Sequence, residues 1–109
     1  MKILHVIPTL SSGGAERFVT DLANELSKYD DCQITIMTLK TESKENIFYK
    51  EELSAKVTYK NLGIEKIKVK DLFKIYRAIK KEKPDIVHYH LANTVYSSHS
   101  PSPMKRYEH

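Results

Sequence analysis

The stretch MKILHVIPTLSSGGAERFVTDLANEL, residues 1–26, decides how this chain folds. Its apolar run at 3–7 is interrupted only by a histidine, which is typical of a parallel strand covered by helices on both faces. Pro8 lacks an N–H and ends that strand, and a turn of small residues, SSGG at 11–14, follows it. Apolar residues then recur at helical spacing, which predicts a helix that ends near residues 28–31.

Beyond this opening, strands and helices continue to alternate. The expected elements are a β-branched strand at 33–39, a short helix at 48–55, a short strand at 57–59 before a turn at Gly63, a helix ended by Pro84, and a strand at 85–90. In the second long helix we expect one apolar face to pack in the core, formed by Val69, Leu72, Phe73, Tyr76 and Ile79. The pattern predicts a Rossmann-like α/β fold, in which a parallel sheet of about four strands is flanked by helices.

The size and composition of the chain limit its organisation. A chain of 109 residues, 40% of them hydrophobic and 29% charged, suits one globular domain and not a two-domain enzyme. We expect that domain at 1–92 and a mobile tail at 93–109, where little can be buried. No stretch is long enough to span a membrane, the first apolar run is too short for a secretory signal, and the single cysteine, Cys32, suits a reducing compartment. A cytoplasmic location is therefore expected.

Positive charge is concentrated in one segment, the basic band at 66–83. It holds eight Lys or Arg against two acidic residues, a local charge of +6 in a chain of net charge +4. The default interpretation is a solvated helix surface. A second is peripheral contact with anionic lipid at the inner face of the membrane, because lysines stand on one side of this helix and aromatic residues on the other. No aromatic ladder or helix-turn-helix spacing accompanies the charge, so we expect no nucleic-acid partner.

The Gly13-Gly14 turn is the first candidate site, because doubly wound sheets bind ligands where a strand ends and a helix begins. Without a Cβ, glycine lets a ligand approach the backbone, and the N–H groups at a helix start favour anionic oxygens. The turn matches neither the GxGxxG fingerprint nor a P-loop. Contact with a phosphate or sugar and a plain tight turn both remain open.

A pair of histidines is the second candidate site. His88 and His90 are two residues apart on an expected strand, so both side chains leave the same face. They share the carboxyl edge with the glycine turn if the first and fourth strands are neighbours, and His5 joins them only if the pairing puts it on that face. They are either core and edge histidines bonded to backbone carbonyls or substrate contacts. Zinc binding by His88, His90 and His99 lacks a suitably spaced acidic or thiolate partner, so no metal is expected.

The opening stretch, together with KPDIVHYHL at 83–91, resembles the N-terminal domain of family 4 retaining glycosyltransferases of the GT-B fold. The resemblance covers residues 1 to about 91 and implies a domain that holds the acceptor. It implies that Gly13 and Gly14 face the diphosphate of the donor. Glu16 and Arg17 would open the helix beside it and line the acceptor cleft with His88 and His90.

The resemblance also implies a catalytic histidine, because VYSSH at 95–99 is similar to a family element that contributes one. His99 would then be catalytic. Only residues 91–94 separate this element from the preceding strand, fewer than a parallel crossover needs. Either the intervening helix has been lost or the match is accidental.

The expected function is that of the N-terminal domain or a fragment of a glycosyltransferase, which would use a nucleotide-sugar donor and a saccharide or lipid-linked acceptor. Without the family's C-terminal, donor-binding domain we expect the chain alone to be inactive, because catalysis needs groups on both sides of a cleft. No cofactor is expected. The alternative is a non-catalytic Rossmann-like interaction module that forms a homo-oligomer through an unpaired strand edge and exposed apolar area. A nucleotide-binding protein of another Rossmann type is the third hypothesis.

Overall fold

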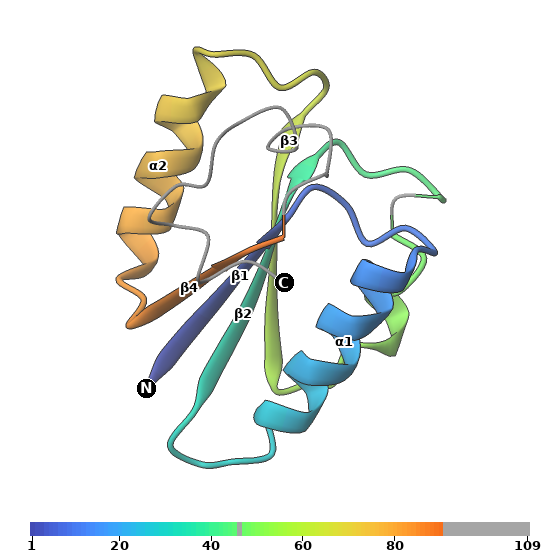
Figure 1. Cartoon of the computed structure of the whole chain (residues 1–109), viewed down its shortest axis with the longest axis vertical. Helices are drawn as coiled ribbons and strands as arrows, with labels where there is room; N and C mark the ends of the chain where they lie inside the picture. The colour runs from blue at the N-terminus through green and yellow to red at the C-terminus, as the bar shows by residue number, and fades with distance from the viewer. Residues whose placement is uncertain (46, 91–109) are drawn as a thin grey trace.

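A computed structural model describes residues 1–45 and 47–90 of the chain. In these residues strands and helices alternate (Figure 1). The elements are β1 Lys2–Ile7, α1 Gly14–Leu26, β2 Gln33–Lys40, the 3-10 turn η1 Lys50–Glu52, β3 Val57–Ile64, α2 Asp71–Glu82 and β4 Ile86–Tyr89. The expected mobile tail at 93–109 and the candidate catalytic residue His99 lie outside the described residues.

The four strands form one parallel sheet in the order β3-β2-β1-β4, which confirms the predicted Rossmann-like α/β fold. β1 therefore lies between β2 and β4, so the condition that the first and fourth strands be neighbours is met. The register pairs His5 with Ile36 of β2 on one side and with His88 of β4 on the other. All carboxyl ends lie at one rim of the sheet because the strands are parallel.

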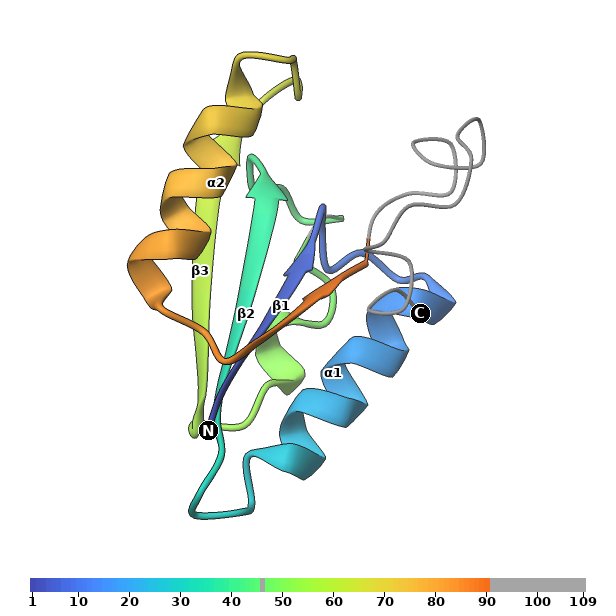
Figure 2. The same ribbon diagram turned by 60° about the vertical axis from the view of Figure 1, so that its left-hand side comes forward.

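Helices cover both faces of the sheet, with α1 on one face and α2 on the other (Figure 2). Successive residues of a strand point to opposite faces, so the apolar run of β1 serves two cores. Ile3 and Ile7 pack in the core that contains Val19 of α1, whereas Leu4 and Val6 pack in the core that contains Ile79 of α2. His5 is two residues from both Ile3 and Ile7, so its side chain points to the same face of the sheet as theirs, the face that α1 covers.

Three elements differ from the sequence prediction by more than one residue. α1 ends at Leu26, earlier than expected, where the Ser27 hydroxyl donates to the Asn24 carbonyl oxygen at 2.8 Å. The short helix expected at 48–55 is limited to η1. The third strand does not stop before Gly63 but continues through it, because the positive φ of this glycine, 65°, lets the strand pass an irregularity in its pairing with β2.

The expectation that the apolar stripe of α2 lies in the core is wrong for most of the stripe. Val69, which precedes the helix, is 80% exposed and Phe73 is 71% exposed; Leu72 and Tyr76 are exposed as well. The helix contacts the sheet instead through Ile75, Ala78 and Ile79, of which only Ile79 belongs to the expected stripe. Residues that recur at helical spacing share a face, but the spacing does not reveal whether another element covers that face.

Candidate functional site

The glycine turn follows β1 and leads into α1 at the carboxyl rim of the sheet (Figure 1). Gly13 caps the helix with an extended backbone, its N–H donates to the Ser11 carbonyl at 2.9 Å, and its carbonyl accepts from the Arg17 N–H at 3.1 Å. Neither Gly13 nor Gly14 has a positive φ. What distinguishes glycine here is therefore the space it leaves and not a special backbone conformation.

That space differs between the two glycines. A Cβ built on Gly13 would lie 2.4 Å from Oε1 of Glu16, whereas a Cβ on Gly14 would meet none of the described residues within 4 Å. Glu16 folds back over the turn, where its Oε2 accepts from the Ser11 hydroxyl at 3.0 Å. A carboxylate is stabilised there by the positive end of the helix dipole. A ligand can thus reach Gly14 without displacing any residue that the structure describes, but at Gly13 it meets the Glu16 carboxylate.

Three imidazoles gather on the α1 side of the sheet, and we call His5, His88 and His90 the histidine cluster. Their ring centroids lie 5.1 Å apart for His5 and His88, 5.4 Å for His5 and His90, and 5.9 Å for His88 and His90. Nδ1 of His5 and Nε2 of His90 are within hydrogen-bonding distance at 3.2 Å. The strand pairing therefore places His5 on the same face of the sheet as His88 and His90, which was the condition for His5 to join them.

Burial controls the protonation of His5. His5 is 0% exposed and His90 is 4% exposed. Desolvation, followed by the neighbouring His90 and His88, lowers the pKa of His5 to about 3. The His5 ring is therefore a neutral imidazole at physiological pH, which can donate one hydrogen bond and accept another or present a lone pair to a ligand.

The strand order brings the glycine turn and the histidines of β4 to the same rim of the sheet. The glycine turn follows the carboxyl end of β1, and His88 and His90 occupy the carboxyl end of its neighbour β4. A model of Glycosyltransferase Family 4 matches residues 12–106, a range that includes both groups. The chain belongs to glycosyltransferase family 4. No curated protein and no solved structure matched it in the same comparisons.

The parallel sheet of this family 4 chain agrees with the N-terminal part of the GT-B fold. Arg17, which the resemblance places beside the glycine turn, lies along the exposed surface of α1, where its Nε is 3.8 Å from an Asp21 carboxylate oxygen. Glu16 and not Arg17 is thus the charged side chain that contacts the turn. Sequence analysis placed both residues at the helix start but could not distinguish them.

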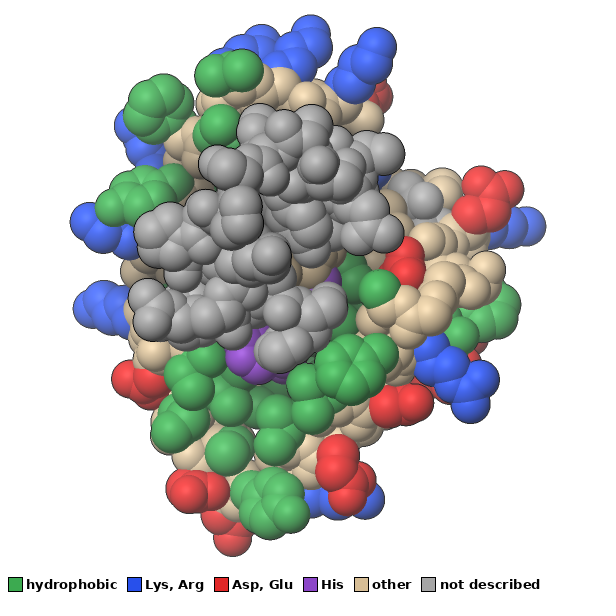
Figure 3. Space-filling model, viewed as in Figure 1, with side chains coloured by type: hydrophobic (Ala, Val, Ile, Leu, Met, Phe, Trp, Pro, Cys, Tyr) green, Lys and Arg blue, Asp and Glu red, His purple; other side chains and the backbone are tan. Residues whose placement is uncertain are grey.

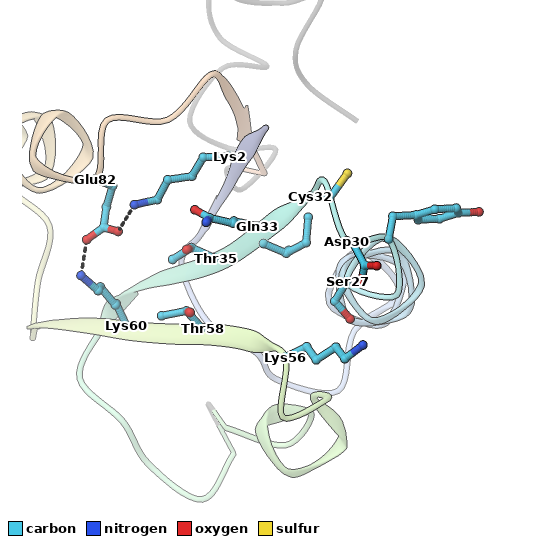
Figure 4. Close-up of a pocket in the computed structure, with 12 residues that line it drawn as sticks. Lys2, Ser27, Asp30, Cys32, Gln33, Thr35, Lys56, Thr58, Lys60 and Glu82 are labelled. Atoms are coloured by element: carbon cyan, nitrogen blue, oxygen red, sulfur yellow. Dashed lines mark hydrogen bonds and ion pairs between the residues drawn. The ribbon is translucent and has the colours of Figure 1, made fainter.

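The family 4 domain also has a hollow of about 380 Å³ at the opposite rim, near the amino ends of β1, β2 and β3 (Figure 4). There the Glu82 carboxylate lies between the amino groups of Lys2 and Lys60. Ligands of parallel α/β sheets bind at the carboxyl ends of the strands, so we assign this hollow no part in sugar transfer. Local sequence patterns did not predict this ion triad, because its members come from three separate elements.

The surface of α2 combines apolar and basic side chains. Figure 3 shows hydrophobic groups interspersed with Lys and Arg along the left-hand edge of the molecule, where α2 lies in Figure 1. The exposed stripe consists of Val69, Leu72, Phe73 and Tyr76. None of the helices in the described ranges combines the length and apolar character needed to cross a bilayer.

Proposed function

We propose that this family 4 chain forms the acceptor-side domain of a glycosyltransferase that moves a sugar from a nucleotide-sugar donor to a saccharide or lipid-linked acceptor. One observation supports this most strongly: the open glycine turn at the start of α1 and the histidines of β4 occupy the same rim of a parallel sheet. Backbone N–H groups at a helix start suit a diphosphate, and imidazoles suit sugar hydroxyls because they both donate and accept hydrogen bonds.

In this proposal Gly14 is the principal contact for the diphosphate, because it alone of the two glycines opens onto free space. The Glu16 carboxylate and the diphosphate are both anions and would repel each other, so Gly13 contributes only after the Glu16 side chain has moved away. His88 and His90 lie beside the acceptor, with Arg17 near the helix start. The catalytic role inferred for His99 rests on the family resemblance alone.

We expect a Gly14→Val variant to lose the contact with the diphosphate while the fold stays intact. The added side chain would occupy the space through which a phosphate reaches the backbone. Titration with inorganic pyrophosphate and with nucleoside diphosphates, followed by amide NMR, should shift the Gly14 resonance of the native chain. In the variant the apparent affinity should fall at least about tenfold, the value of one charge-assisted hydrogen bond.

Ala15→Val is the matched control, because it adds bulk at the next residue, which is also exposed. It should leave the titration unchanged. Equal binding by the Gly14→Val variant, or pyrophosphate shifts confined to other parts of the chain, would contradict the proposed diphosphate contact.

The 109-residue polypeptide on its own should transfer no sugar at a useful rate, because the proposed contacts come from one wall of a cleft. The measurement is release of nucleoside diphosphate from a panel of nucleotide sugars and acceptors. The control is a doubly substituted chain, His99→Ala with Gly14→Val. Release above that control would refute the expected inactivity but would support the glycosyltransferase role.

We also propose that α2 contacts an anionic membrane surface, which would bring the domain to a lipid-linked acceptor. Leu72, Phe73 and Tyr76 are exposed on this helix and are flanked by the cations of the basic band. A helix with exposed apolar groups and lysines can insert the former among lipid chains while the latter pair with headgroups. Because the apolar stripe of α2 is exposed, we favour contact with a membrane over a helix surface that faces only water.

A Phe73→Ser variant is expected to bind vesicles that contain phosphatidylglycerol at least about tenfold more weakly than the native chain, because burying an aromatic side chain contributes roughly 1.5–3 kcal/mol. Co-sedimentation at low and high salt measures the effect. Phe48→Ser is the matched control, since Phe48 is exposed outside α2. Equal binding by the Phe73→Ser variant would contradict membrane contact. If the native chain dimerises as its concentration rises and the Phe73→Ser variant does not, the result would instead support the self-associating interaction module.

A further inference from the structure

The histidine cluster is unusual because it places three imidazoles inside a mainly apolar layer. His5 comes from β1, whereas His88 and His90 come from β4 and its end, and the parallel register brings them together. One nitrogen of each ring lies within 4.8 Å of the corresponding nitrogens of the other two. Nε2 of His5 is buried and has no hydrogen-bonding partner in the part of the chain that the structure describes. Leaving such a nitrogen unsatisfied costs about 1–3 kcal/mol.

We infer that His5, His88 and His90 form a binding site for a divalent late transition metal ion, with zinc as its representative. Imidazole nitrogen is a preferred ligand of zinc, copper and nickel, and three protein ligands leave a further coordination position for water or a substrate oxygen. The zinc set considered from the sequence paired His88 and His90 with His99. In the structure His5 supplies the third imidazole.

The distances suit such an ion. Two nitrogens about 2.0–2.1 Å from a tetrahedral zinc ion lie about 3.3 Å apart. Nδ1 of His5 and Nε2 of His90 are already 3.2 Å apart, so an ion could replace the proton between them. The longest separation in the set, 4.8 Å, would have to shorten by about 1.5 Å, which small rotations of the rings can provide.

Access to the cluster differs between its three members. The cluster is closed on the side of His5 and His90, which are buried, and is more accessible at His88, which is half-buried.

The test uses the 109-residue chain without a polyhistidine tag, treated with chelator and then titrated with Zn²⁺ against a chromophoric competitor. We expect one Zn²⁺ per chain. Co²⁺ in its place should give visible absorption bands of the intensity typical of a four- or five-coordinate site. His88→Gln should weaken Zn²⁺ binding at least about a hundredfold, since even residues that only support a ligand contribute ten- to a hundredfold.

The matched control replaces the two other histidines of the chain, His99→Gln with His109→Gln, and should bind Zn²⁺ as the native chain does. Circular dichroism checks that each variant is folded. If His88→Gln unfolds, nitrogen NMR of the native chain decides, because Zn²⁺ must then shift the imidazole resonances of His5, His88 and His90. No stoichiometric binding, unchanged affinity in His88→Gln, or loss of binding in the control variant would overturn the inference.

Discussion

An Ile36→Ala variant should lose about 3 kcal/mol of unfolding free energy, the largest effect on stability that we expect. Ile36 lies in β2, is fully buried, and packs in the core beneath α1. Truncating it removes apolar contacts and leaves a cavity that a rigid, close-packed layer cannot refill. Urea denaturation of the chain measures the loss. A change below about 1 kcal/mol would contradict the position of Ile36 in the core.

Phe73→Ala is the informative companion to this variant. If the apolar stripe of α2 were core, as its periodicity predicts, this substitution would cost about 3–5 kcal/mol. Because Phe73 is 71% exposed, the expected loss is below about 0.5 kcal/mol. The same denaturation experiment therefore distinguishes the predicted packing of α2 from the observed packing, independently of any membrane.

Glu82→Gln should lower the unfolding free energy at neutral pH by about 2 kcal/mol, because it leaves nearby lysines without their buried counter-ion. Glu82 is 7% exposed, accepts from the Lys60 amino group, and lies 3.3 Å from that of Lys2. Glu25→Gln serves as the control. Glu25 pairs with Lys28 at 2.9 Å on the exposed surface of α1, and such pairs contribute little, so the loss should be under about 0.5 kcal/mol.

The Glu82 contribution should depend on pH. The hydrogen bond from Lys60, aided by Lys2, lowers the pKa of Glu82 below its ordinary value of 4.5. A lowered pKa stabilises the folded state above pH 4.5, and this stabilisation is lost as pH falls from there through the folded-state pKa. The stability gap between the native chain and Glu82→Gln should therefore close on acidification. A gap that stays constant down to pH 2 would exclude the ion pairs as its cause.

The fold could be predicted because its signals are local. An apolar strand, a proline, small residues and a helical stripe are read from neighbouring positions in residues 1–26, and the observed β1, turn and α1 follow them. The same reasoning placed His88 and His90 on one face. It was wrong about α2, whose exposed stripe has the same helical period as a buried one, because periodicity describes the helix and not its neighbours.

By itself the amino-acid sequence determined the alternating elements, the family to which the chain is similar, and the glycine turn between the first strand and the first helix. Only the tertiary structure decided that His5 lies beside His88, that Glu82 forms ion pairs with two lysines, and that the Glu16 side chain folds over the glycine turn. The reason is physical. Side-chain direction along a strand or helix follows from backbone geometry, whereas contacts between distant segments depend on strand order, register and rotamers that no local spacing encodes.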